Sequence, residues 1–113
     1  MTRASEPKRT SDQIIFFKKY TLQAGKRPEF NQLLLASLSG IDADEPETYS
    51  ALVIEDEKKD DVTYVMERFA NQAAVDTHMG GSAKVRSAIR DLVKSGEGGL
   101  FKEFGGGFLS KDE

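Results

Sequence analysis

The sequence predicts an α+β fold of the ferredoxin-like type, in which an antiparallel sheet carries helices on one face. The chain has 113 residues, a length that suits one domain. Strand-like apolar patterns occur in four segments and helical spacing in two others. Their order is β-α-β-β-α-β, the split β-α-β arrangement. We expect a disordered N-terminal arm over residues 1–12, a folded domain over 13–110 and a C-terminal tail over 111–113.

The first strand is expected over residues 13–22. Ile14 and Phe16 share one parity, whereas Ile15 and Phe17 share the other. Apolar residues on both parities indicate a strand that is covered on both faces.

A helix is expected over residues 28–39, because proline is tolerated in a first helical turn and Pro28 begins the segment. Gly40 is the expected stop. The acidic segment that follows contains Pro46 and is expected to be a solvated loop. Apolar side chains recur at helical spacing along the helix and just beyond it: Phe30, Leu33, Leu34, Leu38 and Ile41.

A β-hairpin is expected next. Residues 48–55 and 62–69 have strand composition, and the short charged tract 56–61 separates them.

The second helical region is expected in two pieces. Asn71 can cap the first piece by accepting hydrogen bonds from backbone N–H groups. Gly80 and Gly81 interrupt the helix, and Ser82 is expected to cap the second piece. The second piece carries a further apolar stripe: Val85, Ala88, Ile89, Leu92 and Val93.

A last strand is expected over residues 100–109, after glycines at 96, 98 and 99 and with a break at 105–107. The predicted helices cover one face of the sheet, although strands 13–22 and 62–69 carry apolar residues on both faces. A second copy of the same sheet is the simplest cover for the other face, so we expect a homodimer.

Composition excludes several classes of function. The net charge of -3 argues against a nucleic-acid partner. The absence of cysteine excludes disulfides and thiolate chemistry, and a single histidine leaves no ordinary transition-metal site. No run of 18 apolar residues and no targeting pattern occurs, so we expect a cytoplasmic protein without membrane contact.

One short motif indicates a chemistry. A strand that contains Glu67 and Phe69 leads directly into a helix that contains Ala74 and His78, and then into Ser82 or, with a shift of one residue, Gly81. This pattern, E-x-[FWY]-x-x-x-x-A-x-x-x-H-x-x-[ST], resembles the antibiotic biosynthesis monooxygenase (ABM) family of dimeric α+β barrel proteins.

The resemblance implies a cofactor-independent monooxygenase of secondary metabolism. Enzymes of this family oxidise polycyclic phenols, anthrones or quinols with O2 and use no flavin, haem or metal. An electron-rich phenolate or enolate can itself react with O2, so the protein supplies an apolar pocket, a base and donors that stabilise oxyanion charge. The expected partner is an aromatic small molecule, and no cofactor is expected.

Candidate residues follow from this resemblance and from side-chain chemistry. We expect catalytic roles for His78 and Tyr64, and no metal ligands. The expected substrate-binding residues are Phe16, Tyr20, Tyr49, Met66, Arg68, Asn71 and Phe104.

Each candidate also has a structural alternative. A histidine can close a short helix, aromatic side chains on a sheet usually form a core, and asparagine caps helices. Arg68 can form a surface or interface ion pair.

Two other functions remain open. A non-redox isomerase, cyclase or dehydratase on the same scaffold would act without O2. A non-catalytic ligand-binding or stress-related dimeric barrel would have a pocket filled by phenylalanine side chains.

Overall fold

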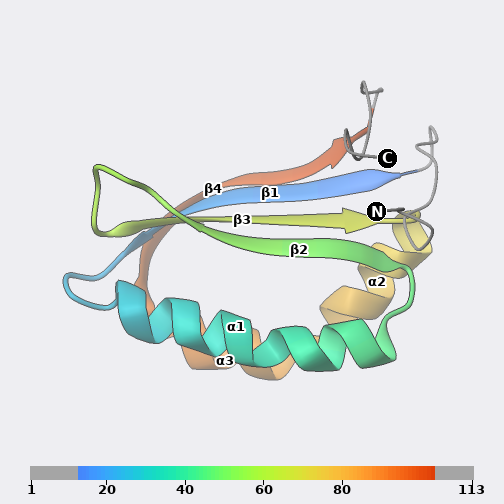
Figure 1. The fold of residues 1–113 in the computed structure, drawn as a ribbon, viewed down its shortest axis with the longest axis horizontal. Coiled ribbons are helices and arrows are strands. Elements are labelled where there is room, and N and C mark those ends of the chain that lie inside the picture. Colours follow the sequence, from blue (N-terminus) through green and yellow to red (C-terminus); the bar gives the residue numbers. More distant parts are fainter. Residues whose placement is uncertain (1–12, 104–113) are drawn as a thin grey trace, which may run out of the picture.

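A computed structural model describes residues 13–103 (Figure 1). The predicted arm over 1–12, the candidate Phe104, the break at 105–107 and the tail over 111–113 lie outside these residues. The elements are β1 (Ile14–Leu22), α1 (Arg27–Asp44), β2 (Thr48–Glu55), β3 (Val62–Phe69), α2 (Gln72–Gly81), α3 (Ala83–Ile89), the 3-10 helix η1 (Arg90–Leu92) and β4 (Val93–Lys102).

The predicted fold class is confirmed. The four strands form one antiparallel sheet in the order β2-β3-β1-β4, so β1 and β3 are central and β2 and β4 are edges. The three α-helices lie together on one face of this sheet (Figure 1). The described part of the chain is therefore a two-layer α+β structure.

The helix α1 extends beyond its predicted end. It runs to Asp44, and Gly40 lies within it. The stop at Gly40 was wrong because Leu38 and Ile41 both face the sheet, so the apolar stripe continues across the glycine. Pro46 ends the helix because the residue before a proline is driven out of the α region, and Glu45 has φ −127° and ψ 76°.

The predicted break in the second helical region lies between α2 and α3. The Asn71 side chain caps α2 by accepting a hydrogen bond of 3.0 Å from the backbone N–H of Ala74. Gly80 and Gly81 belong to the last turn of α2. Ser82 was wrongly predicted as a side-chain cap, because its hydroxyl donates back to the Met79 carbonyl.

The last described strand begins earlier than predicted. β4 starts at Val93 and contains the three glycines that were expected to precede it. At Gly98 glycine is required, because the backbone of β1 approaches closely. Gly98 has φ +134°, and a Cβ at this position would collide with the Phe17 carbonyl oxygen. A Cβ at Gly96 would lie 2.7 Å from Cε of Lys18.

The core consists of two apolar clusters at opposite ends of the layer. One contains Leu22, Phe30, Ile89 and Leu92, and the other contains Phe69, Ala70, Ala74 and Val75. Leu22 ends β1, whereas Phe69 pairs with the first residue of β1, so a strand length separates the clusters. The middle of the layer is therefore left to other side chains.

A polar network joins α1 to the β2–β3 hairpin. Nη1 of Arg27 donates to three backbone carbonyls, those of Asp56, Lys59 and Val62, at 2.9–3.1 Å. The Asn31 side chain accepts from Thr63, which is fully buried, at 2.8 Å and donates to Glu55 at 2.7 Å. Because buried polar groups are costly without partners, this network holds the start of α1 in one position.

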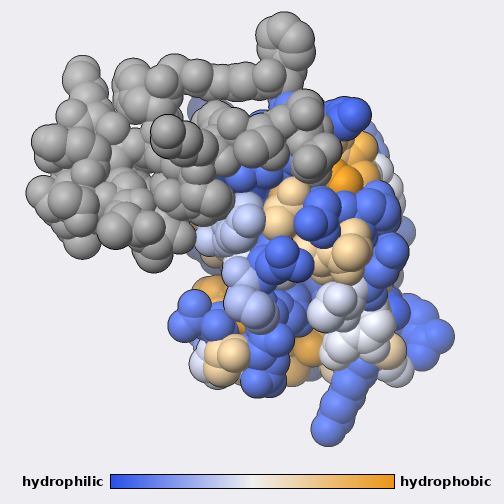
Figure 2. Space-filling view, turned by 90° about the vertical axis from the view of Figure 1, so that its right-hand side faces the viewer, coloured by the Kyte–Doolittle hydropathy of each residue, from blue (hydrophilic) through white to orange (hydrophobic). Residues whose placement is uncertain are grey.

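The sheet face opposite the helices carries a group of apolar side chains, beside polar ones such as Lys19 and Arg68. We call it the outer sheet face; by strand pairing it carries Ile15, Phe17, Ile54, Tyr64, Met66 and Phe101. Phe17, Ile54 and Phe101 are 38–53% exposed. At the end of the molecule where α2 lies, hydrophilic side chains surround smaller apolar patches (Figure 2). No helix within residues 13–103 is long and apolar enough to cross a membrane.

Gly98→Ala is expected to destabilise the fold by about 1–3 kcal/mol, because alanine is strained at positive φ and its Cβ would meet the backbone of β1. Gly99→Ala is the matched control, since no atom lies within 4 Å of its Cβ position. Urea unfolding of both variants measures the difference. Equal unfolding midpoints would contradict the close approach of β4 to β1.

Candidate functional site

A cavity of about 400 Å³ lies between the helices and the sheet. This volume falls within the range of roughly 300–1,000 Å³ that is typical of small-molecule sites. It occupies the middle of the layer, between the two core clusters. Its walls are mainly apolar and include Leu34, Leu38, Ile41, Val53, Val65 and Ile89.

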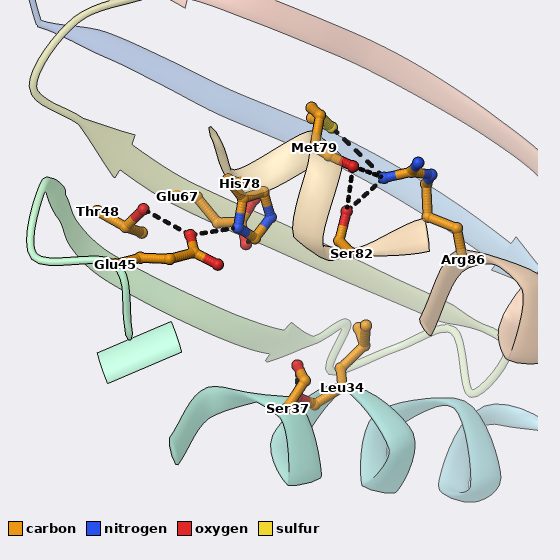
Figure 3. A network of polar contacts seen from close by, with 9 residues as sticks. All are labelled: Leu34, Ser37, Glu45, Thr48, Glu67, His78, Met79, Ser82 and Arg86. Atoms are coloured by element: carbon orange, nitrogen blue, oxygen red, sulfur yellow. Dashed lines mark hydrogen bonds and ion pairs between the residues drawn. The ribbon is translucent and has the colours of Figure 1, made fainter. Parts of the chain in front are cut away.

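His78 lies at this cavity between two carboxylates. It stands on α2 and is 6% exposed. Its Nδ1 lies 2.8 Å from Oε1 of Glu45, and its Nε2 lies 3.3 Å from Oε2 of Glu67. Figure 3 shows these residues together with Thr48, whose hydroxyl donates to Oε1 of Glu45 at 3.0 Å.

The two carboxylates come from different elements. Glu45 follows the last turn of α1, and Glu67 lies on the central strand β3 with its side chain toward the helices. The three ionisable groups therefore join the end of α1, α2 and the sheet. This junction depends on α1 continuing past Gly40.

The surroundings of His78 favour its protonated form. The hydrogen bond to Glu67 is the largest cause of the shift. Burial lowers the pKa of His78, but the charge of Glu67 and the hydrogen bond and charge of Glu45 add to the first effect, and the pKa rises to about 9. At neutral pH the ring is an imidazolium, and its two N–H groups face carboxylates. It can donate hydrogen bonds and supply positive charge, but it has no free nitrogen with which to accept a proton.

Tyr20 contributes a phenol to the same cavity. Burial, and then the charge of Glu67, raise its pKa to about 12. The hydroxyl therefore stays protonated at neutral pH and can serve as a donor. The ammonium of Lys18 lies 5.1 Å from the centre of the Tyr20 ring.

Arg86 adds positive charge to the cavity wall. Its Nη1 donates to the Met79 carbonyl at 2.8 Å and also contacts the Ser82 hydroxyl (Figure 3). These contacts fix the turn between α2 and α3. Arg86 itself is exposed, so the cation stands at the solvent side of the site.

The structure brings three of the predicted site residues to the cavity: Phe16, Tyr20 and His78. The Asn71 side chain is used as a helix cap, and Tyr49 packs against the cluster around Phe69. Neither lines the cavity.

The other described candidates lie on the sheet face away from the cavity. Tyr64 stacks on Phe17, and its hydroxyl donates to the Asp56 carboxylate at 3.1 Å. Met66 pairs across the sheet with Phe17. Arg68 forms a buried ion pair of 3.2 Å with Glu103. All three lie on β3, where they alternate with the cavity-lining residues Val65 and Glu67. Adjacent side chains of a strand point to opposite faces, so these candidates point away from His78.

Sequence reasoning missed the roles of Glu45 and Glu67. Glu45 was expected in a solvated loop, but its side chain is only 15% exposed and binds His78. No local signal could have revealed a contact across 33 residues. Glu67 did carry a signal, because it interrupts the apolar parity of Val65 and Phe69 on a central strand.

The side chains of Glu45, His78 and Glu67 do not surround a common point at which a metal ion could bind. The two carboxylates face opposite nitrogens of one imidazole ring, so a single ion could not bind all three groups. Within residues 13–103 no group of three or more histidine, aspartate and glutamate side chains is arranged to hold a metal ion.

The pKa of His78 predicts a pH-dependent stability. Because the folded pKa of about 9 lies above the ordinary 6.5, the contribution is complete below pH 6.5 and is lost as the pH rises through 9. The free energy of unfolding should fall by up to roughly 3 kcal/mol over this interval. Urea titrations at a series of pH values measure it.

His78→Gln is the control for this experiment. His78 is the single histidine of the chain, so the variant should lose the slope between pH 6.5 and 9. An equal slope in both proteins would show that another group is responsible.

Solved structures of known proteins share this fold. A protein from Bacteroides thetaiotaomicron, provisionally named an antibiotic biosynthesis monooxygenase, matches with a TM-score of 0.78 at 16% identity, covering 88% of this chain and 97% of that one. SnoaB from Streptomyces nogalater, described as a cofactor-independent oxygenase, matches with a TM-score of 0.72 at 19% identity, covering 88% and 99%.

A protein from Deinococcus radiodurans with the same provisional name has a TM-score of 0.74 at 19% identity, covering 87% of this chain and 99% of that one. No protein-family model matches the sequence, and no curated protein matches it in sequence. At these identities the likeness concerns the fold alone. The chain has the fold of the antibiotic biosynthesis monooxygenase proteins, as the motif over residues 67–82 predicts.

Proposed function

We propose that this protein is a cofactor-independent monooxygenase that oxidises a polycyclic phenol, anthrone or quinol with O2. One observation carries the proposal: a mainly apolar cavity of about 400 Å³ has a buried Glu45–His78–Glu67 cluster in its wall. The apolar walls suit a flat aromatic substrate, and the cluster supplies groups for moving a proton.

The reaction needs no reductant besides the substrate. With an anthrone, loss of one C–H proton yields an enolate, which passes electrons to O2 and forms a C–O bond. Loss of water then gives the quinone. One oxygen atom of O2 stays in the product and the other leaves as water together with the two hydrogens of the substrate carbon.

The cavity residues suit the charges that arise along this path. The positive charge of the His78 imidazolium and a hydrogen bond from the Tyr20 hydroxyl can stabilise the enolate oxygen, because both groups are protonated at neutral pH. Apolar side chains exclude water, which strengthens these interactions. The similarity in fold to SnoaB, described as a cofactor-independent oxygenase, supports the same reaction class.

A second function is favoured by the same cluster. Carboxylates beside an imidazolium can move protons without any redox step, as an isomerase, cyclase or dehydratase requires. Product formation from the same substrates without O2 would favour this alternative. A non-catalytic barrel would have a pocket filled by phenylalanine side chains. The open cavity argues against this alternative.

O2 uptake with anthrones, naphthols and hydroquinones, measured on chelator-treated protein, tests the monooxygenase. Uptake should resist the chelator, and His78→Ala should lower it by about 100-fold or more, because the variant loses the buried positive charge.

Asp76→Asn is the matched control, since Asp76 is an exposed residue on the same helix. It should retain wild-type uptake. Wild-type protein that consumes no O2 with any substrate of the panel would contradict the proposal.

We also propose that the outer sheet face pairs with a second copy of the chain. Phe17, Ile54 and Phe101 expose apolar surface on a sheet whose only described helices cover the opposite face. Exposed apolar side chains on neighbouring strands favour an interface with another molecule. In a two-fold dimer the outer sheet faces of the two copies would pack against each other and bury these side chains, as in a hydrophobic core.

Ile54→Lys is expected to shift the protein from dimer to monomer in sedimentation experiments, because it places a charge on this face. Leu35→Lys is the matched control: Leu35 is also exposed, at 48%, but lies on α1. A monomeric wild-type protein at micromolar concentration, or a dimer that survives Ile54→Lys, would refute the outer sheet face as the interface.

A further inference from the structure

We propose that Glu67 is the group that accepts the substrate proton and that His78 is a positioning residue that holds its carboxylate. This inference rests on the proposed function and deepens it, because it assigns the first step of the reaction to one side chain.

The position of Glu67 is unusual for a carboxylate. It lies on the central strand β3 and is 7% exposed. Its neighbours across the sheet are Phe16 on β1 and Ala51 on β2, and all three line the cavity. A charged group in the middle of an apolar sheet face is costly to bury and points to a function.

Other groups at the cavity are less suited to accept a proton, and the Asp44 carboxylate, which also lines it, is exposed to solvent. The two nitrogens of His78 face carboxylates, and the Tyr20 hydroxyl already carries a proton. Oε1 of Glu45 accepts hydrogen bonds from both His78 and Thr48. Glu67 contacts His78 through Oε2, and no hydrogen bond from residues 13–103 engages its Oε1.

The charge balance favours this step. With both carboxylates ionised, the Glu45–His78–Glu67 cluster carries one net negative charge. When the substrate C–H or O–H bond breaks, the proton joins a Glu67 oxygen and the electron pair stays on the substrate as an enolate or phenolate. One negative charge moves from the carboxylate to the substrate, so the total charge in the cavity stays constant, and the imidazolium remains beside it.

The backbone holds this geometry. Glu67 is fixed by pairing of β3 on both sides, and His78 by the capped helix α2. Glu45 holds Nδ1 of His78 and thereby directs Nε2 toward Glu67. A proton acceptor on such rigid elements meets the requirement for positioned general bases.

Exchange of the C–H protons of anthrone into deuterated buffer, without O2, tests the assignment. Wild-type protein should accelerate exchange above the buffer rate. Glu67→Gln should lower the accelerated rate by about 100-fold or more, because glutamine can still accept a hydrogen bond from His78 but cannot take a proton. Glu67→Asp should restore part of the rate. Asp76→Asn, at an exposed residue of α2 that does not line the cavity, should leave it unchanged.

His78→Gln should lower kcat for exchange while changing KM little, since it loosens the acceptor and leaves the apolar walls intact. Circular dichroism and urea unfolding confirm that each variant is folded. If Glu67→Gln does not fold, the comparison of Glu67→Asp with the wild type decides, with a lowered kcat at similar KM expected.

The outcomes separate this inference from the proposed function. Exchange that depends on Glu67 in a protein that consumes no O2 would support the proton acceptor and remove the monooxygenase. O2 uptake by the wild type, together with an exchange rate in Glu67→Gln equal to that of the wild type, would support the monooxygenase and remove Glu67 as the proton acceptor. A wild-type protein that does not accelerate exchange would overturn the inference.

Discussion

The contact of one imidazolium with two carboxylates is the constraint on which the site depends. His78 joins Glu45 after α1 to Glu67 on β3, so three segments far apart in sequence meet at one buried group. Buried charges persist only when they are paired, and each member here has a partner. The resulting pKa of about 9 keeps the ring charged at neutral pH. The site therefore presents one positive imidazolium between two carboxylates.

The cavity exists because the apolar core is divided. Leu22 and Phe30 anchor one end of the layer, and Phe69 and Val75 anchor the other. Between them the residues that face inward include Glu67 and the amphipathic Tyr20, which do not fill the space as a continuous apolar core would. A domain of this size buries only a modest apolar core, so a cavity lowers the number of stabilising contacts appreciably. Burial of the outer sheet face by a second copy would compensate for the apolar contacts that the cavity gives up.

Sequence reasoning succeeded where the signal is local. The alternation along residues 62–69 and the charged tract before it predicted the hairpin, and Asn71 predicted a cap that the structure contains. It failed where glycine was taken as a stop. Gly40 lies within a helix, and Gly96 and Gly98 lie within a strand, since packing against neighbouring elements outweighs local preference.

The sequence by itself determined the α+β class and the order of the elements, because periodicity and caps are encoded in neighbouring residues. Only the tertiary structure decided which polar groups meet. It paired His78 with Glu45 across 33 residues, kept Tyr20 at the cavity and left Tyr64 on the opposite sheet face. The physical reason is that strand register and helix length set side-chain directions, and a shift of one residue reverses them.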